Sequence, residues 1–270
     1  MNIDPRNLQT DRLVFVPTVH VVAATALTAE FHERVDENAR GQTRIDQDAG
    51  PDAERLVEFA GRKCYDSYGK GRSSRAYHEH IIESGHYSVL EHSNITFEIS
   101  GVSRGLTHEL VRHRVGVAIS QRSTRYVDES DCRMIVPPVF VVQPEDSDEV
   151  ATLKKIQQEI FLKGHQDSTA NYTFLVHGSQ HLELDRKAAR GAARSTLGNG
   201  IETSLVWTCN LRSLLNVLRQ RGSEAADAEI RRLAVELYRK ALPYAPAIFA
   251  ECVQVYTVDG GAPALMVKSP

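Results

Sequence analysis

The chain has 270 residues, of which 41% are hydrophobic, and it carries a formal net charge of −3 at pH 7. This length can bury a sizeable core, and the slightly acidic balance argues against a general nucleic-acid binder, whose whole domain is normally basic. No run of about 18 apolar residues and no signal-peptide core is present, so we expect neither membrane spanning nor secretion.

The cysteines and histidines do not follow the spacing of a metal site. The four cysteines are Cys64, Cys132, Cys209 and Cys252. They lie far apart without a CxxC pair, which is typical of neither a zinc site nor a disulfide framework and fits a reducing cytoplasm. His78 and His80 are two residues apart and would point to different faces of a helix. We therefore predict no metal.

The first third of the chain contains several predicted elements. Residues 12–30 have apolar runs on both sides of Pro17, which predicts a strand broken at the proline and then a second strand or helix. Residues 31–53 are polar with weak periodicity, and we interpret them as a polar insertion or mobile loop. Apolar spacing predicts a helix over residues 53–64.

Serine caps and glycine stops define the next elements. Ser73 and Ser74 are suited to cap a helix that runs to about Ser84 and stops at Gly85. Residues 93–100 then alternate apolar and polar side chains, which predicts a half-buried strand ending at Gly101.

A short helix is predicted to begin at Ser103 and to end near Val111. Glu109 and Arg112 are three residues apart and share a face near its end. The basic segment that follows therefore begins where this helix gives way to a loop.

The rest of the chain reads as helices and one strand. Helices are predicted over residues 146–167, about 169–182 and 224–240, and alternation predicts a strand over residues 201–209. The helix at 210–221 buries a leucine stripe and leaves Arg212 and Asn216 on its polar side. No internal repeat or linker is present, so we expect one domain, residues 1–270, of interleaved α/β structure.

Residues 110–126, LVRHRVGVAISQRSTRY, contain five basic side chains and no acid. Arginine binds phosphate or carboxylate in a bidentate manner, and serine or threonine hydroxyls add neutral donors. This block therefore predicts an anion-binding site. The alternative interpretation is a solvated basic loop or helix end.

Four motifs of the chain resemble those of the flavin-dependent thymidylate synthases, often called ThyX. They are RHR followed by SQRSTRY within residues 110–126, GHYSVLEH at 85–92, NLRSLLNVLRQR at 210–221, and the pair Ala193 and Arg194. They occur in the family's order over about residues 55–250. The resemblance implies a single domain with a mostly antiparallel sheet flanked by helices.

The resemblance also implies an activity: reductive methylation of uracil C5 in dUMP, with methylenetetrahydrofolate as carbon donor and NADPH as reductant. The hydride would come from reduced FAD, so that the cofactor carries the chemistry while the protein binds and orients. No cysteine lies in a motif that suggests an activated thiolate. A cytoplasmic homotetramer with sites between subunits is implied, and neither nucleic acid nor a membrane is an expected partner.

Site residues follow from the resemblance. The implied cofactor-binding residues are His86, Ser88, Glu91, Arg112, His113, Arg114, Gln121, Asn210, Arg212 and Asn216. The implied nucleotide-binding residues are Glu109, Arg112, Gln121, Arg122, Ser123, Thr124, Arg125, Arg194 and Arg221. Arg221 is the expected catalytic residue, because a guanidinium beside the uracil ring stabilises negative charge that develops there. Its alternative role is that of a helix-terminal arginine in a favourable dipole position.

Two departures from the family pattern touch this site. Eight residues, Val115 to Arg122, separate RHR from Ser123, where the family usually has seven, and Ala225 stands where the family commonly has a histidine. With the flexible Gly116, the longer loop predicts that UMP is accepted as well as dUMP. A dedicated UMP methylase of nucleoside-antibiotic biosynthesis is an alternative.

A non-enzymatic nucleotide- or RNA-binding regulator is the alternative of another class. RNA binding commonly uses aromatic side chains among the basic ones, and Tyr126 is the only aromatic residue in the block.

Overall fold

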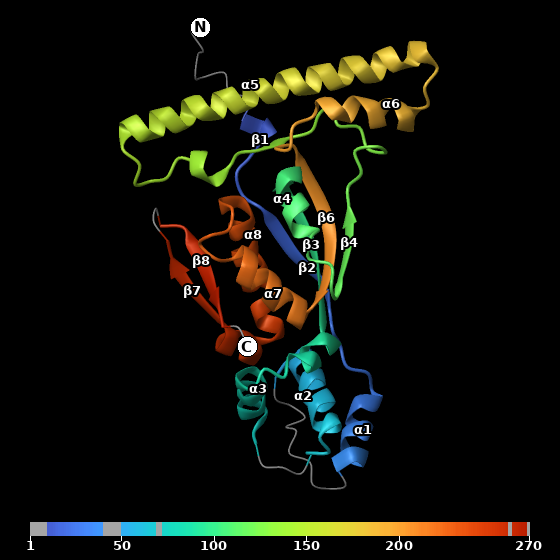
Figure 1. The fold of residues 1–270 in the computed structure, drawn as a ribbon, viewed down its shortest axis with the longest axis vertical. Coiled ribbons are helices and arrows are strands. Elements are labelled where there is room, and N and C mark those ends of the chain that lie inside the picture. Colours follow the sequence, from blue (N-terminus) through green and yellow to red (C-terminus); the bar gives the residue numbers. More distant parts are fainter. Residues whose placement is uncertain (1–9, 40–49, 69–71, 259–260, 269–270) are drawn as a thin grey trace. The chain divides into compact units, whose positions relative to one another are not determined.

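The computed structural model describes residues 10–39, 50–68, 72–258 and 261–268 (Figure 1). The chain forms two compact units whose segments alternate along the sequence. Unit 1 comprises Met1–Thr18, Ile99–Val111 and Ser120–Leu205. Unit 2 comprises Val19–Glu98, Arg112–Ile119 and Val206–Pro270.

A four-stranded sheet has the order β2-β3-β6-β4. Its strands are β2 (Thr18–Ala24), β3 (Asn94–Ser103), β4 (Val117–Gln121) and β6 (Glu202–Asn210). Beside β6, the Asn210 amide donates to the Gly116 carbonyl (3.1 Å) and the Arg122 amide to the Ser204 carbonyl (2.9 Å). Residue numbers rise along β4 while those of the bonded residues on β6 fall, so β4 and β6 are antiparallel. The predicted α/β class, with a mostly antiparallel sheet flanked by helices, is confirmed.

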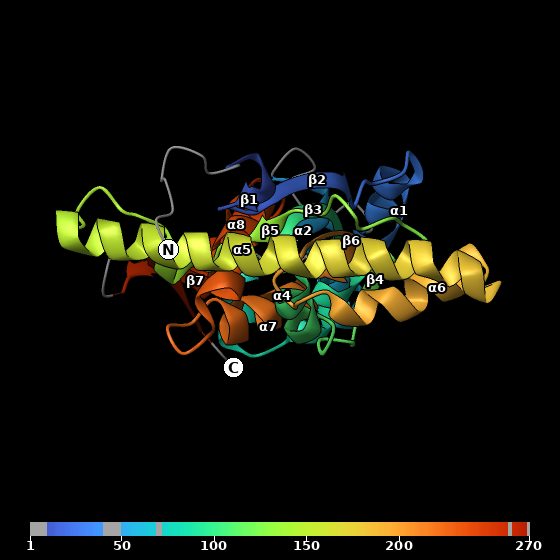
Figure 2. The same cartoon turned by 90° about the horizontal axis from the view of Figure 1, so that it is seen from above.

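In unit 1, β1 (Leu13–Val14) pairs in parallel with β5 (Met134–Ile135). Helix α4 (Arg104–Leu110) is capped by Ser103, whose hydroxyl accepts the Leu106 amide proton at 2.9 Å. Two further helices, α5 (Asp148–Gly178) and α6 (Arg186–Ala193), run side by side (Figures 1 and 2).

Unit 2 is mainly helical around a leucine-rich core. Its helices are α1 (Glu30–Ala39), α2 (Asp52–Cys64), α3 (Ser74–Glu83), α7 (Leu211–Arg221), α8 (Ala228–Ala241) and α9 (Pro246–Cys252). An antiparallel hairpin of β7 (Val253–Thr257) and β8 (Pro263–Val267) follows α9. Among the described residues the short 3-10 segments are η2 (Thr10–Arg12), η3 (Tyr87–His92), η4 (Pro138–Phe140), η5 (Ser179–Leu182), η6 (Arg194–Thr196) and η7 (Leu242–Tyr244).

Several predicted boundaries agree with the structure. The strand break at Pro17 separates β1 from β2, and the cap at Ser73 starts α3. Gly85, just after α3, has φ +69°, the left-handed conformation that favours glycine at a helix end. The basic segment begins directly after α4, as predicted.

Other predictions were wrong. The expected loop at 31–53 is helical over Glu30–Ala39, where Phe31 and Val35 are buried, and again from Asp52; residues 40–49 lie outside the described residues. Amphipathic packing therefore outweighs the polar composition of this stretch.

The two helices predicted between 146 and 182 are one continuous helix, α5. The strand predicted to end at Gly101 continues to Ser103, because Gly101 takes φ +68° within it. The last predicted helix begins at Ala228 rather than at 224, since Asp227 supplies its cap.

Candidate active site

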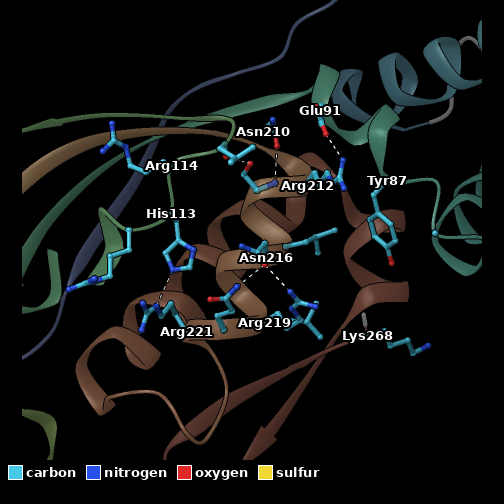
Figure 3. A pocket seen from close by; sticks show the side chains of 17 residues that line it. Tyr87, Glu91, His113, Arg114, Asn210, Arg212, Asn216, Arg219, Arg221 and Lys268 are labelled. Atoms are coloured by element: carbon cyan, nitrogen blue, oxygen red, sulfur yellow. Dashed lines mark hydrogen bonds and ion pairs between the residues drawn. The ribbon is translucent and has the colours of Figure 1, made fainter. Parts of the chain in front are cut away.

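A cavity of about 770 Å³ lies in unit 2, on the polar side of α7 (Figure 3). Its lining residues are Gly85, Tyr87, Glu91, Arg112, His113, Arg114, Val115, Asn210, Arg212, Ser213, Leu215, Asn216, Arg219, Gln220, Arg221, Val267 and Lys268. They come from η3 and the turn before it, the segment after α4, the end of β6, α7 and the end of the β7–β8 hairpin.

Helix α7 carries much of the cavity wall because its sequence separates apolar and polar faces. Leu211, Leu214 and Leu218 are fully buried, which fixes the rotation of the helix. Asn210 caps the helix by accepting the Ser213 amide proton at 2.8 Å. The opposite face then presents the polar residues to the cavity, as predicted from the 210–221 motif.

The cavity is strongly cationic. Five arginines and one lysine line it: Arg112, Arg114, Arg212, Arg219, Arg221 and Lys268. Glu91 is the one acid among the lining residues, and it pairs with Arg212 at 2.5 Å. Such a wall favours a ligand with several negative charges.

Arg221 and His113 face each other in this cavity (Figure 3). The Nε–H of Arg221 donates to Nε2 of His113 at 3.0 Å. Burial lowers the pKa of His113, and the positive charge of Arg221 lowers it too. The imidazole is therefore neutral near pH 7, with its proton on Nδ1 and an unprotonated Nε2 facing Arg221.

The segment after His113 is held close to the start of α7. The Ser213 hydroxyl donates to the Val115 carbonyl at 2.6 Å. Gly116 has φ +65°, and a Cβ on it would lie 2.2 Å from Nδ2 of Asn210. Gly116 thus lies close to the side chains of Asn210 and Ser213, and its positive φ favours glycine there.

The cavity fits the FAD implied by the sequence motifs. Its volume lies within the roughly 300–1,000 Å³ typical of cofactor sites. Its guanidinium groups suit a pyrophosphate, and the amide side chains of Asn210 and Asn216 supply the few polar groups that orient a largely aromatic ligand.

Most of the predicted cofactor residues meet at this cavity. Those that line it are Glu91, Arg112, His113, Arg114, Asn210, Arg212 and Asn216, together with the predicted catalytic residue Arg221. His86 and Ser88 are exposed and do not line it. Instead His86 stacks on Tyr65, with ring centroids 5.8 Å apart and planes at 21°.

The predicted nucleotide residues from 121 to 125 and Arg194 belong to unit 1. The Gln121 side-chain amide donates to the hydroxyls of Thr107 (3.0 Å) and Thr203 (3.3 Å). Arg194 donates to the hydroxyl of the buried Thr124 at 3.4 Å. Both predicted residues are thus held in place by threonines of the same unit.

Ser123 begins a tight turn in unit 1 that exposes the arginine following it. The Ser123 carbonyl accepts the amide protons of Tyr126 and Val127, and its hydroxyl accepts that of Arg125 at 3.4 Å. Arg125 is exposed, whereas Arg122 pairs with the buried Glu129 at 3.1 Å. Burial is the main effect on Glu129 and raises its pKa. Glu109, also in unit 1, is half-buried near the end of α4.

Three basic residues near the predicted site residues were not predicted from the sequence: Arg104 in unit 1, and Arg219 and Lys268 in unit 2. In unit 1, Arg104 is half-buried and donates to the Arg122 carbonyl at 3.5 Å. Burial and the neighbouring Arg194 lower the pKa of Arg104, while Glu129 raises it. Its position directly after the Ser103 cap was the available signal. In unit 2, Arg219 sits within the recognised 210–221 motif, whereas Lys268 had no sequence signal.

The cysteines do not supply an activated nucleophile in this structure. Burial raises the pKa of Cys132 and that of Cys252 to about 12 each, and it raises the pKa of the fully buried Cys209 as well. Cys64 is exposed and lies at the end of α2. No cysteine lines the cavity in the described part of the chain.

Neither a metal cluster nor a membrane-spanning helix occurs among the described residues. No group of three or more His, Cys, Asp or Glu side chains among them could hold a metal ion. None of the helices in the described ranges is long and apolar enough to cross a membrane.

Comparison with known proteins gives a consistent set of relatives. A family model described as "Thymidylate synthase complementing protein" matches residues 45–247. The chain is similar to the flavin-dependent thymidylate synthase of Mycobacterium avium (strain 104), with 42% identity over 226 residues covering 80% of this chain and 84% of that protein. It is likewise similar to those of Mycobacterium leprae (strain Br4923), 42% identical over 220 residues (76% and 82% covered), and Mycobacterium bovis (strain BCG / Pasteur 1173P2), 41% identical over 219 residues (80% and 84%).

Proposed function

The chain belongs to the family of flavin-dependent thymidylate synthases, and from this membership we propose that it reductively methylates uracil C5 of dUMP. Methylenetetrahydrofolate is the proposed carbon donor, FAD the cofactor and NADPH the reductant. When bound, the reduced flavin supplies the hydride. The observation that carries this proposal is the cationic cavity in which His113 and Arg221 meet.

Arg221 is the proposed catalytic residue. Its Nε–H is directed to Nε2 of His113, a contact that holds the guanidinium in the cavity. A guanidinium placed beside N3 and O2 stabilises the negative charge that develops when the ring is activated at C5. Because the group is half-buried, the interaction is screened less than at an exposed site.

Phosphate binding is assigned to the basic cluster of unit 1. Ser123, Arg125 and Arg194 are the proposed ligands of the nucleotide phosphate, with Gln121 holding the nucleoside. Support comes from Arg125, which is exposed at a turn, and from Arg194, which is fixed by Thr124. Arginine forks and serine hydroxyls are the donors that phosphate recognition commonly uses.

A protein nucleophile is not part of the proposed chemistry. The three buried cysteines have raised pKa values and are therefore thiols, not thiolates, near neutral pH. Transfer of the one-carbon unit to C5 and its reduction to methyl would then depend on the cofactor's hydride and on charge stabilisation by the protein, which agrees with the arginine-rich wall.

UMP is a second proposed substrate. The support is the eight-residue spacing between RHR and Ser123. Residues 117–121 form β4 rather than a loop, and the two backbone bonds to β6 are six residues apart on both strands, so no bulge absorbs the extra residue there. The additional residue therefore sets Ser123 one residue further from RHR along the segment that contains β4.

We also propose a cytoplasmic homotetramer, with sites shared between subunits, built from single catalytic domains. Support for assembly comes from α5, on which Val150, Leu153, Ile156 and Ile160 are all at least 42% exposed. Their spacing places them along one side of the helix, a pattern typical of an interface. The four cysteines are all free, which suits a reducing compartment.

Flavin binding tests this function against the regulator alternative. The full-length protein is titrated into FAD while flavin fluorescence and the visible spectrum are followed, and a single-stranded RNA is titrated in parallel. The proposal expects saturable FAD binding. RNA binding without any FAD binding would support the regulator and overturn the enzyme.

A further inference from the structure

We propose that the β7–β8 hairpin completes the cofactor cavity, and that Lys268 contacts a phosphate group of the bound dinucleotide, making the site selective for FAD over phosphate-free flavin. This inference rests on the proposed FAD site. It concerns residues that lie beyond the segment 45–247 matched by the family model.

The hairpin is fixed to the end of the helix that bears Arg221. The Leu265 amide donates to the Gly222 carbonyl at 2.7 Å. A Cβ on Gly222 would lie 2.8 Å from both Cβ and Cδ1 of Leu265, so the two backbones are packed without room for another carbon. Tyr256 adds a second attachment, since its hydroxyl oxygen accepts the Glu224 amide proton at 3.2 Å.

The hairpin also has its own hydrophobic anchor. Ala264 and Leu265 on β8 are 0% and 1% exposed, so the strand contributes to the core. Val253 pairs with Val267 in the antiparallel register, which brings the end of β8 beside the beginning of β7. An element held in this way presents its next residue at a defined position.

Lys268 is the residue so presented. Its amide donates to the Cys252 carbonyl at 2.8 Å, and its exposed side chain lines the cavity (Figure 3). Val267 lines the cavity as well. None of the described carboxylates forms an ion pair with its ammonium group. The Lys268 charge lowers the pKa of Cys252, although burial raises that pKa by more.

The positive charge of the cavity indicates which part of the ligand Lys268 would contact. Glu91 is already paired with Arg212, so the cavity holds a clear excess of positive charge before any ligand binds. An ammonium on a four-carbon stem is a point charge well suited to a phosphate oxygen. The isoalloxazine ring carries no such anion, whereas the pyrophosphate of a dinucleotide does.

Equilibrium titration of FAD and riboflavin, followed by flavin fluorescence, tests the inference. K268M removes the positive charge, K268E reverses it and K268R preserves it, whereas K240E changes an exposed lysine on α8 that does not line the cavity. One exposed charged contact corresponds to about a three- to tenfold change in affinity. We expect the FAD Kd to rise about threefold in K268M and about tenfold in K268E.

The control variants and riboflavin show whether the effect depends on the charge at position 268 and on the phosphate groups of FAD. K268R and K240E should stay within about twofold of the parent Kd, and riboflavin affinity should be the same in all five proteins. Unchanged FAD affinity in K268E would overturn the inference, as would an equal loss for riboflavin. Failure of the unaltered protein to bind FAD at all is a different result, because it would contradict the proposed function itself.

Discussion

The Nε–H of Arg221 donates to an unprotonated Nε2 of His113 at 3.0 Å, across 108 positions of sequence. The hydrogen bond fixes the rotation of the Arg221 guanidinium and requires a neutral imidazole. Burial and the charge of Arg221 both favour that neutral state. His113 is thus a positioning residue for the arginine proposed to act on the uracil ring.

Acidification should break this contact. The pKa of His113 lies below its ordinary value of 6.5, so the imidazole stays neutral through pH 7 and gains a proton only as the pH falls through the lowered value. Protonation leaves two N–H donors facing each other. We predict that kcat falls on the acid side of pH 6.5.

The same linkage affects stability. Because the folded-state pKa is depressed, the contribution of His113 to folding is present above pH 6.5 and is lost as the pH falls through the folded value. H113Q keeps a hydrogen-bond acceptor that does not titrate. Its kcat should therefore not show the part of the decrease below pH 6.5 that protonation of His113 causes in the parent. Identical pH–kcat profiles for H113Q and the parent would mean that protonation of His113 does not cause the fall of kcat at acid pH.

Arg221 and Arg125 should fail in different ways. R221A should lower kcat strongly with a smaller effect on nucleotide affinity, because ring polarisation matters most as charge develops. R125A should mainly weaken nucleotide binding, by about tenfold or more, through loss of a charged hydrogen bond. Steady-state kinetics with equilibrium nucleotide binding separates the two, and the reverse pattern would show that the roles are exchanged.

Gly116 should not tolerate a side chain. Alanine there would require φ +65° and would put Cβ 2.2 Å from Nδ2 of Asn210, the residue that caps α7. We predict that G116A lowers the free energy of unfolding by about 1–3 kcal/mol. Gly198 is the matched control, because nothing lies within 4 Å of the position of its Cβ. Equal urea midpoints for G116A and G198A would contradict the close packing.

The exposed face of α5 should hold the proposed tetramer together. Ile160 is 65% exposed, and a charge on it would be desolvated in an interface. We predict that I160D shifts sedimentation velocity profiles from tetramer toward smaller species, whereas K155E, on an exposed polar position of the same helix, leaves them unchanged. A parent protein that sediments as a monomer would remove the proposal.

The sugar preference has a direct competition test. With dUMP and UMP in one reaction, the ratio of products gives the ratio of specificity constants. A pocket without a wall against the 2′-hydroxyl discriminates by only about a hundredfold or less, so we predict measurable methylation of UMP. Preference for dUMP beyond about ten-thousandfold would show that the segment from Val115 to Arg122 closes on the 2′ position of the sugar despite its additional residue.

Sequence periodicity was sufficient for the elements whose local signals agree with their packing. Helix α7 is the clearest case, because an asparagine cap and a leucine stripe both indicate the observed helix. The RHR motif and the 210–221 motif, both identified in the sequence, line the same cavity in the structure.

Where packing overrides local signals, the sequence was insufficient. Within α5 the buried Leu162 and Tyr172 span a stretch in which most other side chains are polar, so its continuity depends on tertiary contacts. The β7–β8 hairpin was not predicted. Its apolar residues Val255 and Met266 are exposed, so its sequence does not follow a regular alternation of buried apolar and exposed polar residues. Consequently Lys268 could not be placed at a cavity whose other cations lie at least 47 positions earlier.

The central claim is flavin-dependent methylation that requires Arg221. Its most direct test is mass spectrometric detection of dTMP after incubation of the full-length protein with dUMP, methylenetetrahydrofolate, FAD and NADPH. We predict dTMP in the complete reaction, none when FAD is omitted from flavin-stripped protein, and a loss of about a hundredfold or more with R221A. Undiminished dTMP formation without flavin, or with R221A, would contradict it.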